Sequence, residues 1–359
     1  MKISDVTVYK VKPRWIFVKI STDEGIEGWG EMISGTKTET VVAGAYEIGN
    51  RLIGRNPFEI ERLFQEMHRS FFRGGPINGT IVSGLEMALW DIKGKAFNVP
   101  VYELLGGAAR DKIKVYSWIG GDRPSEVAEQ AQDRFDRGFT AVKMNATEEL
   151  HYIDSYQKVD EVVERVASIR ERFGDAMDIG VDFHGRVHKP MAKVLAKALE
   201  PFHPMFLEEV VLPENEEHFK EVADSVAVPL ATGERLYTRW QFKNLFKQGT
   251  VDIIQPDVAL CGGILETRKI AAMAEAYDMA VAPHAPYGPV ALAATLQVDS
   301  CTPNVFIQEQ SLGIHYNKGF DLLDFVKNKE VFQYKDGYVD LPSKPGLGLE
   351  MDEDKIKEI

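Results

Sequence analysis

Three acidic residues, spaced at equal intervals of 26 positions, each follow a short apolar run: Asp182, Glu208 and Glu234. If these runs are consecutive strands of one parallel sheet, the carboxylates lie side by side at its carboxyl end. Crowded carboxylates raise one another's pKa, and a hard divalent cation that prefers oxygen ligands removes that cost. The spacing therefore predicts a metal site, with Mg²⁺ as the ion. The alternative is that these acids only cap the helices that follow them.

Two histidines follow other parts of the same pattern and are candidates for proton transfer. His184 stands two positions after Asp182, so on a strand both side chains point to the same face, and we expect His184 to act as an acid beside the metal. His284 follows the seventh apolar run, across the predicted rim from His184. Asp257, after the sixth run, is placed to accept a hydrogen bond from His284 and to fix its tautomer. Either histidine alone could be structural, and Asp257 could be a turn residue after Pro256.

A further carboxyl group, that of Glu309, ends the eighth apolar run. If the sheet closes into a barrel, this residue reaches the same rim as the metal site from the other side. A protonated carboxyl group at that place could donate a hydrogen bond to a developing enolate oxygen. The spacing alone equally allows a solvated carboxylate at the rim, without a role in chemistry.

These candidates require a framework of repeated strands and helices. Short apolar runs alternate with amphipathic helical patterns, for example at 124–137 and 265–277. Repeated βα units predict a parallel sheet, and eight of them predict an α/β fold closed as a (β/α)₈, TIM-like barrel. An open doubly wound sheet is the alternative, but the sequence has no Gly-rich phosphate turn after the first strand. The eight predicted strands are 113–116, 140–144, 178–182, 205–207, 228–231, 251–254, 279–282 and 304–307.

The regions at the two ends of the chain have a different pattern. Strand-like segments at 6–9, 16–20 and 26–31 precede a region, 39–97, in which apolar residues recur at helical spacing. The last stretch, from about 325, looks like a return of the chain to this N-terminal module. The predicted organisation is an α+β capping domain formed by residues 1–112 plus 322–359 and a barrel formed by residues 113–321.

Composition narrows the classes of protein. The chain has 359 residues, of which 44% are hydrophobic and 27% charged, as in ordinary soluble globular proteins. Its formal net charge of −13 argues against a nucleic-acid groove, which needs clustered Lys and Arg. No stretch is typical of a signal peptide or a membrane span. Two cysteines, Cys261 and Cys301, are too few for a disulfide framework, so we expect a cytoplasmic protein without membrane or nucleic-acid partners.

Several motifs along the chain carry a resemblance to a known family. They are Trp29-Gly30-Glu31, Ala88-Leu89-Trp90-Asp91-Ile92-Lys93-Gly94-Lys95, Tyr116-Ser117-Trp118, Asp182-Phe183-His184-Gly185-Arg186, Gly233-Glu234-Arg235, Gln308-Glu309-Gln310-Ser311 and 313–319. These motifs resemble those of the enolase superfamily, mandelate racemase subgroup. The likeness runs over essentially the whole chain, and it implies a site in which a Lys or His base works with Mg²⁺, as is general in that superfamily.

The resemblance implies the same roles for the same residues. Asp182, Glu208 and Glu234 match the metal ligands, His284 with Asp257 matches the base and its supporting carboxylate, His184 matches the acid, and Glu309 matches the enolate stabiliser. It also implies that loops near Arg14-Trp15 and 34–38 close over the substrate. The implied reaction is the dehydration of a sugar acid, galactonate first, to a 2-keto-3-deoxy acid by a carbon–oxygen lyase that forms symmetric homo-oligomers.

The alternatives are a dehydratase for another aldonate or an aldarate such as gluconate, a racemase or cycloisomerase, and a catalytically silent structural homologue. Racemases of this subgroup tend to carry Lys-x-Lys on the second strand, whereas this chain reads Lys143-Met144-Asn145, which favours elimination. Two other departures from the subgroup are Val210 in place of a proline and Tyr287 in the loop after His284. In addition, related dehydratases continue with a Trp-containing tail, whereas the sequence here stops at Ile359. They leave specificity and subunit contacts open.

Overall fold

The N-terminal module is built on a three-stranded antiparallel sheet. The computed structural model describes residues 1–33, 35–69, 74–121 and 125–357. The strands pair in the order β1-β2-β3, and every residue of β2 except one is buried because the strand lies between its neighbours and is covered by the helices of the module. The three strands span Ile3–Val11 (β1), Trp15–Thr22 (β2) and Glu27–Ile33 (β3).

Helix α3 lies directly on β3, and two glycine positions show how closely. A Cβ atom at Gly30 would stand 1.8 Å from the carbonyl oxygen of Gly84, and one at Gly28 would stand 2.1 Å from that of Ala88. Any side chain there would push the helix off the sheet. Close packing therefore explains the glycine in the Trp29-Gly30-Glu31 motif. The helices of this module are α1 (Thr38–Gly49), α2 (Ile60–His68), α3 (Gly75–Phe97) and the short α4 (Val101–Leu104).

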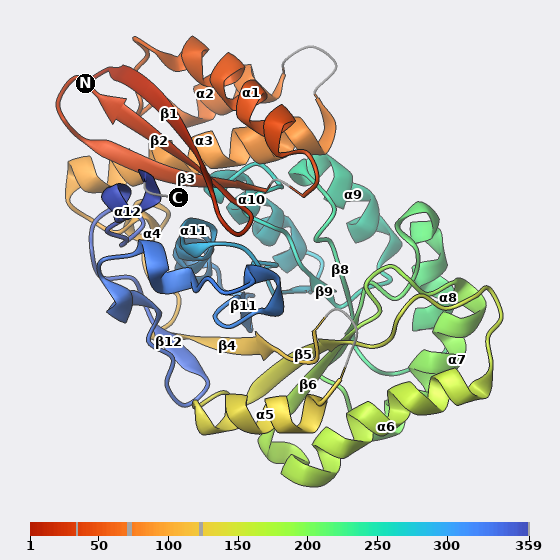
Figure 1. Ribbon diagram of the computed structural model, residues 1–359. Coiled ribbons are helices and arrows are strands. Elements are labelled where there is room, and N and C mark those ends of the chain that lie inside the picture. Colours follow the sequence, from red (N-terminus) through yellow and green to blue (C-terminus); the bar gives the residue numbers. More distant parts are fainter. Residues whose placement is uncertain (34, 70–73, 122–124, 358–359) are drawn as a thin grey trace.

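The barrel consists, in the described residues, of eight parallel strands with the neighbour order β10-β9-β8-β7-β6-β5-β4-β11. An isolated parallel bridge between Val281 and Val305 joins β10 to the segment before β11. Figure 1 shows the strands surrounded by helices, with the N-terminal module lying over one side of the barrel. The strands are β4 (Lys112–Trp118), β5 (Ala141–Asn145), β6 (Asp178–Asp182), β7 (Phe206–Glu208), β8 (Leu230–Thr232), β9 (Ile253–Ile254), β10 (Ala280–Val281) and β11 (Gln308–Gln310).

The eighth strand was predicted at the wrong place. The apolar run 304–307 contributes only the bridge at Val305, and the strand that pairs with β4 is Gln308–Gln310. A run of polar residues forms this strand because its side chains are buried inside the protein, where they are held by other polar groups. Tertiary surroundings thus override the preference that the residue types show by themselves.

The helices between the strands follow the expected amphipathic pattern. In α6 the buried residues are Val159, Val162, Val166 and Ile169, which recur at helical spacing and face the sheet, while charged residues lie outside. By contrast α11 is buried all round, because it packs between the barrel and the N-terminal module. The remaining bounds are α5 (Val127–Asp136), α6 (Tyr156–Phe173), α7 (Lys189–Leu199), α8 (Phe219–Ala223), α9 (Thr238–Gln248), α10 (Ile264–Glu275) and α11 (Pro289–Cys301).

Two buried glutamates of the N-terminal module dock it onto the barrel. Glu31, on β3, accepts hydrogen bonds from the backbone N–H groups of Gly288 and Ala291 at 2.6 and 2.9 Å, at the start of α11. Glu86, on α3, accepts from the N–H groups of Ile264 and Leu265 at 2.7 and 3.0 Å, at the start of α10. Each carboxylate thus satisfies backbone donors that a helix leaves without partners at its N-terminus.

The C-terminal segment passes along β4 of the barrel and ends at the N-terminal module, as Figure 1 shows. Strand β12 (Tyr338–Asp340) pairs antiparallel with the first part of β4, and α12 (Glu353–Lys357) brings Glu353 to Tyr9 and Lys19 at 2.7 and 2.9 Å. Both cysteines are buried and carry free thiols. Among the described helices, none combines the length and apolarity that a bilayer crossing requires.

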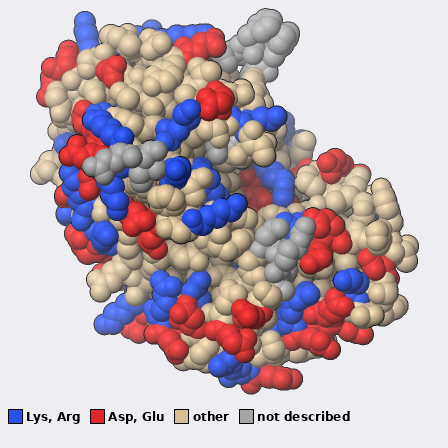
Figure 2. All heavy atoms as spheres, viewed as in Figure 1, with Lys and Arg blue, Asp and Glu red and all other residues tan. Residues whose placement is uncertain are grey.

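Charged side chains of both signs are mixed on the face of the molecule that Figure 2 shows. Blue and red groups alternate over the barrel helices and over the N-terminal module, and the basic groups do not merge into one stripe on this face.

Candidate active site and metal centre

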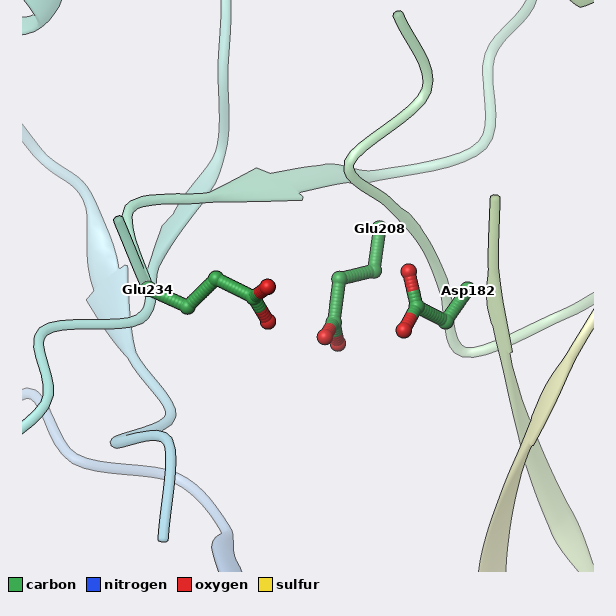
Figure 3. A group of neighbouring side chains, drawn as sticks. All are labelled: Asp182, Glu208 and Glu234. Carbon is green, nitrogen blue, oxygen red and sulfur yellow. The ribbon is translucent and has the colours of Figure 1, made fainter. Parts of the chain in front are cut away.

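Three carboxylates meet at the carboxyl end of the barrel. Asp182 ends β6, Glu208 ends β7, and Glu234 lies two residues after β8. All three are buried, and one oxygen of each lies within 4.8 Å of the others. Figure 3 shows the three side chains converging, with Glu208 between the other two. The expected juxtaposition is therefore present, because consecutive strands in register carry Asp182 opposite Glu208.

The surroundings shift the pKa values of Glu208 and Glu234 in opposite directions. Burial raises the pKa of Glu208 well above its ordinary value, and the neighbouring carboxylates of Asp182 and Glu234 add to that effect. Burial alone would also raise the pKa of Glu234, but His284 and Arg235 lower it to about 2. A set of oxygen ligands gathered so closely suits a hard divalent cation, which would compensate their mutual repulsion. The residues present thus fit such an ion.

His284 stands at the Glu234 end of the cluster, held by Asp257. Its Nδ1 lies 2.7 Å from Oδ2 of Asp257, and a parallel bridge joins the two backbones after β9 and β10. Its Nε2 lies 3.4 Å from Oε2 of Glu234, so the second ring nitrogen faces the carboxylates. Burial by itself lowers the pKa of His284, but Glu234, Glu309 and Asp257 raise it to about 10.

Asp257 combines the two roles that the sequence left open. Besides binding His284, it accepts a hydrogen bond from the N–H of Ala259 at 2.7 Å through Oδ1, as a turn residue does. The turn therefore fixes the carboxylate, and the carboxylate fixes the imidazole ring. Such a pair sets which nitrogen of the ring carries the proton.

His184 stands at the Asp182 end of the cluster. Its Nδ1 lies 2.8 Å from Oδ2 of Asp182, and its backbone N–H donates to Oδ1 at 2.6 Å. The contact arises differently from the prediction: β6 ends at Asp182, and His184 adopts a left-handed backbone with φ +57° instead of continuing the strand. Although burial opposes it, the hydrogen bond to Asp182 raises the pKa of His184. The two histidines thus flank the carboxylates at opposite ends.

Glu309 is fully buried, so it is not a solvated rim carboxylate. It accepts hydrogen bonds from Nε1 of Trp118 and from the N–H of Ala285, the latter at 2.7 Å. Although burial alone would raise it, the pKa of Glu309 is lowered by the ammonium group of Lys143 and by His284. These surroundings oppose protonation of Glu309, and its expected role as a hydrogen-bond donor to a developing enolate oxygen stays a prediction.

Lys143 belongs to this site, although it was not among the predicted site residues. It is fully buried on β5, with Nζ 2.7 Å from Glu208 and 3.1 Å from Glu309. In the sequence analysis this lysine served only to show that a second lysine is missing at Asn145. Its place within an apolar strand could have indicated a site residue, because a buried lysine needs buried anionic partners.

The predicted loop at Arg14 does approach the barrel rim. The Arg14 guanidinium group donates to the carbonyl of Pro286, in the loop after His284, and lies 5.3 Å from the centre of the Tyr287 ring and 5.1 Å from that of Tyr316. Trp15, by contrast, is buried in the module core. Of the second predicted loop, Ser34 lies outside the described residues, and Thr38 already begins α1.

Comparison with known proteins agrees with this geometry. Residues 1–106 match the family described as mandelate racemase / muconate lactonizing enzyme, N-terminal domain, and residues 126–355 match the family described as enolase C-terminal domain-like. The chain belongs to the mandelate racemase subgroup of the enolase superfamily. The resemblance inferred from the motifs is thereby confirmed, and so is the barrel with an N-terminal cap.

Relatives in this subgroup cover nearly the whole chain. The chain is 52% identical over 357 residues to proteins named D-galactonate dehydratase from Variovorax paradoxus (strain S110) and from Cronobacter sakazakii (strain ATCC BAA-894), covering 99% of this chain and 94% of each relative. Among solved structures, a mandelate racemase/muconate lactonizing enzyme-like protein from Roseovarius sp. TM1035 superposes with a TM-score of 0.91 at 33% identity, covering 100% of this chain and 95% of that one. A member of the enolase superfamily from Salmonella Typhimurium gives 0.88 at 31%, covering 99% and 98%.

Proposed function

We propose that this chain is a Mg²⁺-dependent hydro-lyase that dehydrates D-galactonate to the 2-keto-3-deoxy acid. The single observation that carries the proposal is the imidazole of His284, held by Asp257 on one side and facing the carboxylate cluster on the other, at 2.7 and 3.4 Å. The two relatives at 52% identity, both named D-galactonate dehydratase, support the substrate.

Asp182, Glu208 and Glu234 would hold the Mg²⁺ ion, whose usual oxygen ligands they match in type and arrangement. When bound, the ion supplies positive charge beside the substrate carboxylate as the neighbouring proton leaves. Lys143 adds a buried positive charge between Glu208 and Glu309, on the same side of the barrel. Charge that develops on the substrate thus meets fixed positive groups in a site shielded from water.

In the proposed reaction Nε2 of neutral His284 takes the proton from C2 of the substrate, and Asp257 keeps the ring oriented through Nδ1. The raised pKa of His284 comes from the charges of Glu234 and Glu309, which a bound cation would offset. His184 gives a proton to the 3-hydroxyl group, and the C3–O bond breaks with the loss of water. His184 is suited to this because its Nδ1 is bound to Asp182, so Nε2 handles the proton. The resulting enol takes up a proton at C3 and becomes the 2-keto acid.

The test is the variant His284→Asn, assayed for keto acid formation from D-galactonate with Mg²⁺. We expect kcat to fall about 10²- to 10⁴-fold, as for loss of a general base, and proton exchange at C2 to fall with it. The matched control is His218→Asn, a half-buried histidine paired with Glu221 away from the cluster, which should retain activity. Undiminished dehydration by His284→Asn would remove this residue from the role of base.

The Arg14–Tyr287 contact at the rim motivates a second substrate class. Because the Tyr287 ring packs against His284 and contacts Arg14, we expect the two side chains to bear on which distal hydroxyl groups fit. Gluconate or another aldonate or aldarate is the runner-up substrate. A panel of sugar acids, each followed by keto acid formation, separates these cases. Turnover of gluconate but not of D-galactonate would overturn the substrate and keep the reaction.

We also propose that the protein is cytoplasmic, that it forms a homo-oligomer, and that its capping domain comprises residues 1–112 plus 322–359 and its barrel residues 113–321. The contacts of Glu353 with Tyr9 and Lys19 support placing the C-terminal segment with the cap. Light scattering coupled to gel filtration tests the oligomer: a mass equal to one chain would contradict it.

A further inference from the structure

Arg235, beside the carboxylate cluster, contacts three loops of the barrel rim. It follows the metal-ligand candidate Glu234, and its Nη2 lies 3.1 Å from Oε1 of that residue. The same nitrogen donates to the carbonyl of His184 at 3.2 Å, and Nη1 lies 2.5 Å from Oε2 of Glu209. The guanidinium group therefore connects the loops that follow β6, β7 and β8.

Two of these loops carry a residue in a backbone conformation that side chains disfavour. His184 has φ +57° and Glu209 has φ +47°, both in the left-handed region. Such conformations cost free energy and persist only where surrounding contacts hold them. Arg235 contacts both residues, and the N–H of Gly185 donates to the carbonyl of Glu209 at 3.0 Å, which ties the same two loops together.

Glu209 itself is firmly placed. It is 4% exposed, and its Oε1 accepts hydrogen bonds from the Thr232 hydroxyl group at 2.8 Å and from the N–H of Gly233 at 3.2 Å. Its other oxygen is thereby aimed at Arg235. The loop after β8 is thus anchored to Glu209 from both sides of Glu234, by backbone on one side and by the arginine on the other.

We infer that Arg235 is a positioning residue, which holds Glu234 and the His184 loop in the arrangement that binds the divalent cation. The inference rests on the proposed function. A planar guanidinium group can reach two carboxylates and a carbonyl at once, whereas an ammonium group is a single point charge. Substitution by lysine thus keeps the charge and removes the geometry.

The first experiment measures cation affinity directly, by isothermal titration of the full-length protein with MgCl₂ alone. We expect Arg235→Lys to weaken Mg²⁺ binding about 10- to 100-fold, the range found when groups that orient metal ligands are lost. Thermal unfolding is measured in parallel, to show that the variant is folded. Mg²⁺ affinity within about twofold of the wild type would overturn the inference.

Arg239→Lys is the matched control. Arg239 is also an arginine paired with a buried glutamate, Glu266, and its guanidinium group lies 4.1 Å from the centre of the Trp240 ring, on α9 away from the carboxylate cluster. If loss of any buried arginine pair weakens the site by loosening the fold, Arg239→Lys lowers Mg²⁺ affinity as well. Equal losses in the two variants would therefore overturn the inference, and an unchanged affinity in the control supports it.

A second measurement distinguishes positioning from general support of the fold. A cavity of about 220 Å³ lies beside Arg235, lined also by Glu209, Tyr237 and Gln241. Added guanidinium ion, at concentrations well below those that unfold proteins, can enter this cavity in Arg235→Ala and restore part of the Mg²⁺ affinity and of kcat. No restoration in a folded Arg235→Ala protein counts against the inference, and if that variant does not fold, Arg235→Lys decides alone.

The outcomes separate this inference from the proposed function. If the wild-type protein binds Mg²⁺ and dehydrates a sugar acid while Arg235→Lys binds Mg²⁺ equally well, only the inference fails. If the wild-type protein dehydrates no sugar acid but Arg235→Lys still weakens Mg²⁺ binding, the inference holds and the proposed reaction fails. A wild-type protein that binds no Mg²⁺ contradicts both.

Discussion

Buried carboxylates occur in two regions of this protein, and their surroundings differ. Glu31 and Glu86, where the N-terminal module meets the barrel, are met by backbone N–H groups at the starts of α11 and α10. At the barrel rim, Glu208 and Glu234 are met chiefly by one another and by side-chain cations such as Lys143. The carboxyl groups of the first region meet fixed backbone donors, while the second region gathers charge that is suited to a cation and a substrate.

The difference shows how to tell a structural carboxylate from a functional one. Backbone donors at a helix N-terminus are fixed, directional and present whenever the helix forms, so a carboxylate there stabilises the fold. Carboxylates that face one another repel and therefore oppose folding, so their presence indicates a function such as cation binding. Accordingly, removal of a rim carboxylate should cost activity, and removal of a docking carboxylate should cost stability. Three predictions test that contrast, beginning with the largest effect.

The largest effect is expected for Glu208→Gln at the centre of the cluster. Loss of a ligand charge should lower kcat at least about 10³-fold, because several kcal/mol of charge stabilisation depend on the ion. The free energy of unfolding should change little, because relief of the repulsion among the three carboxylates offsets the loss of the ion pair with Lys143. Steady-state kinetics and urea unfolding without Mg²⁺ measure the two quantities. A large loss of stability would remove the contrast between the regions.

Glu86→Ala should have the opposite signature. The substitution leaves the N–H groups of Ile264 and Leu265 and the indole N–H of Trp90 without their acceptor, and we expect a loss of about 3 kcal/mol in unfolding free energy. Mg²⁺ affinity of the folded protein should be unchanged. The control is Glu61→Ala, which removes an exposed ion pair with Lys269 and should cost under about 1 kcal/mol. Equal losses of unfolding free energy in the two variants would show that the hydrogen bonds from the backbone to Glu86 do not stabilise the fold more than a surface ion pair does.

The smallest effect concerns pH. Burial raises the pKa of Glu31 to about 7, although the N–H groups of Ala291 and Gly288 and the charge of Arg14 oppose the shift, and Asp257 adds to it. Because the pKa is higher in the folded state, the stability linked to this group is present below its ordinary pKa of 4.5 and is lost as pH rises towards 7. The unfolding free energy of the wild type minus that of Glu31→Gln, measured in urea at several pH values, should decrease over that interval. A flat difference would show that the helix start keeps Glu31 charged throughout.

Much of the framework could be predicted from the sequence because burial and periodicity are local signals. The predicted strand 178–182 is β6, and equal spacing of Asp182, Glu208 and Glu234 correctly placed them together. The prediction failed for the eighth strand, where Gln308–Gln310 is polar in sequence and buried in the fold. Only the surrounding barrel makes such a segment a strand, so no local pattern could have indicated it.

Details of the site depend on contacts between distant residues, and these were predicted less well. The partners of Glu309 are the ammonium group of Lys143 on β5 and the N–H groups of Trp118 and Ala285, none of which is near it in sequence. The spanning position of Arg235 likewise arises only when three loops meet. Residue types at strand ends could therefore be assigned to a site, and the pairing of His284 with Asp257 could be predicted, whereas the contacts of Lys143 and Arg235 could not.

The close crossing of β3 and α3 at Gly30 and Gly84 has a consequence for how this protein can diversify. Each glycine is near one of the docking glutamates, Glu31 on the strand and Glu86 on the helix. Because the two backbones are in direct contact at Gly30 and Gly84, the distance between Glu31 and Glu86 does not depend on the sequence of the nearby loops. Substitutions near Arg14 can therefore change the contacts with Pro286 and Tyr287 at the barrel rim while the module stays docked on the barrel.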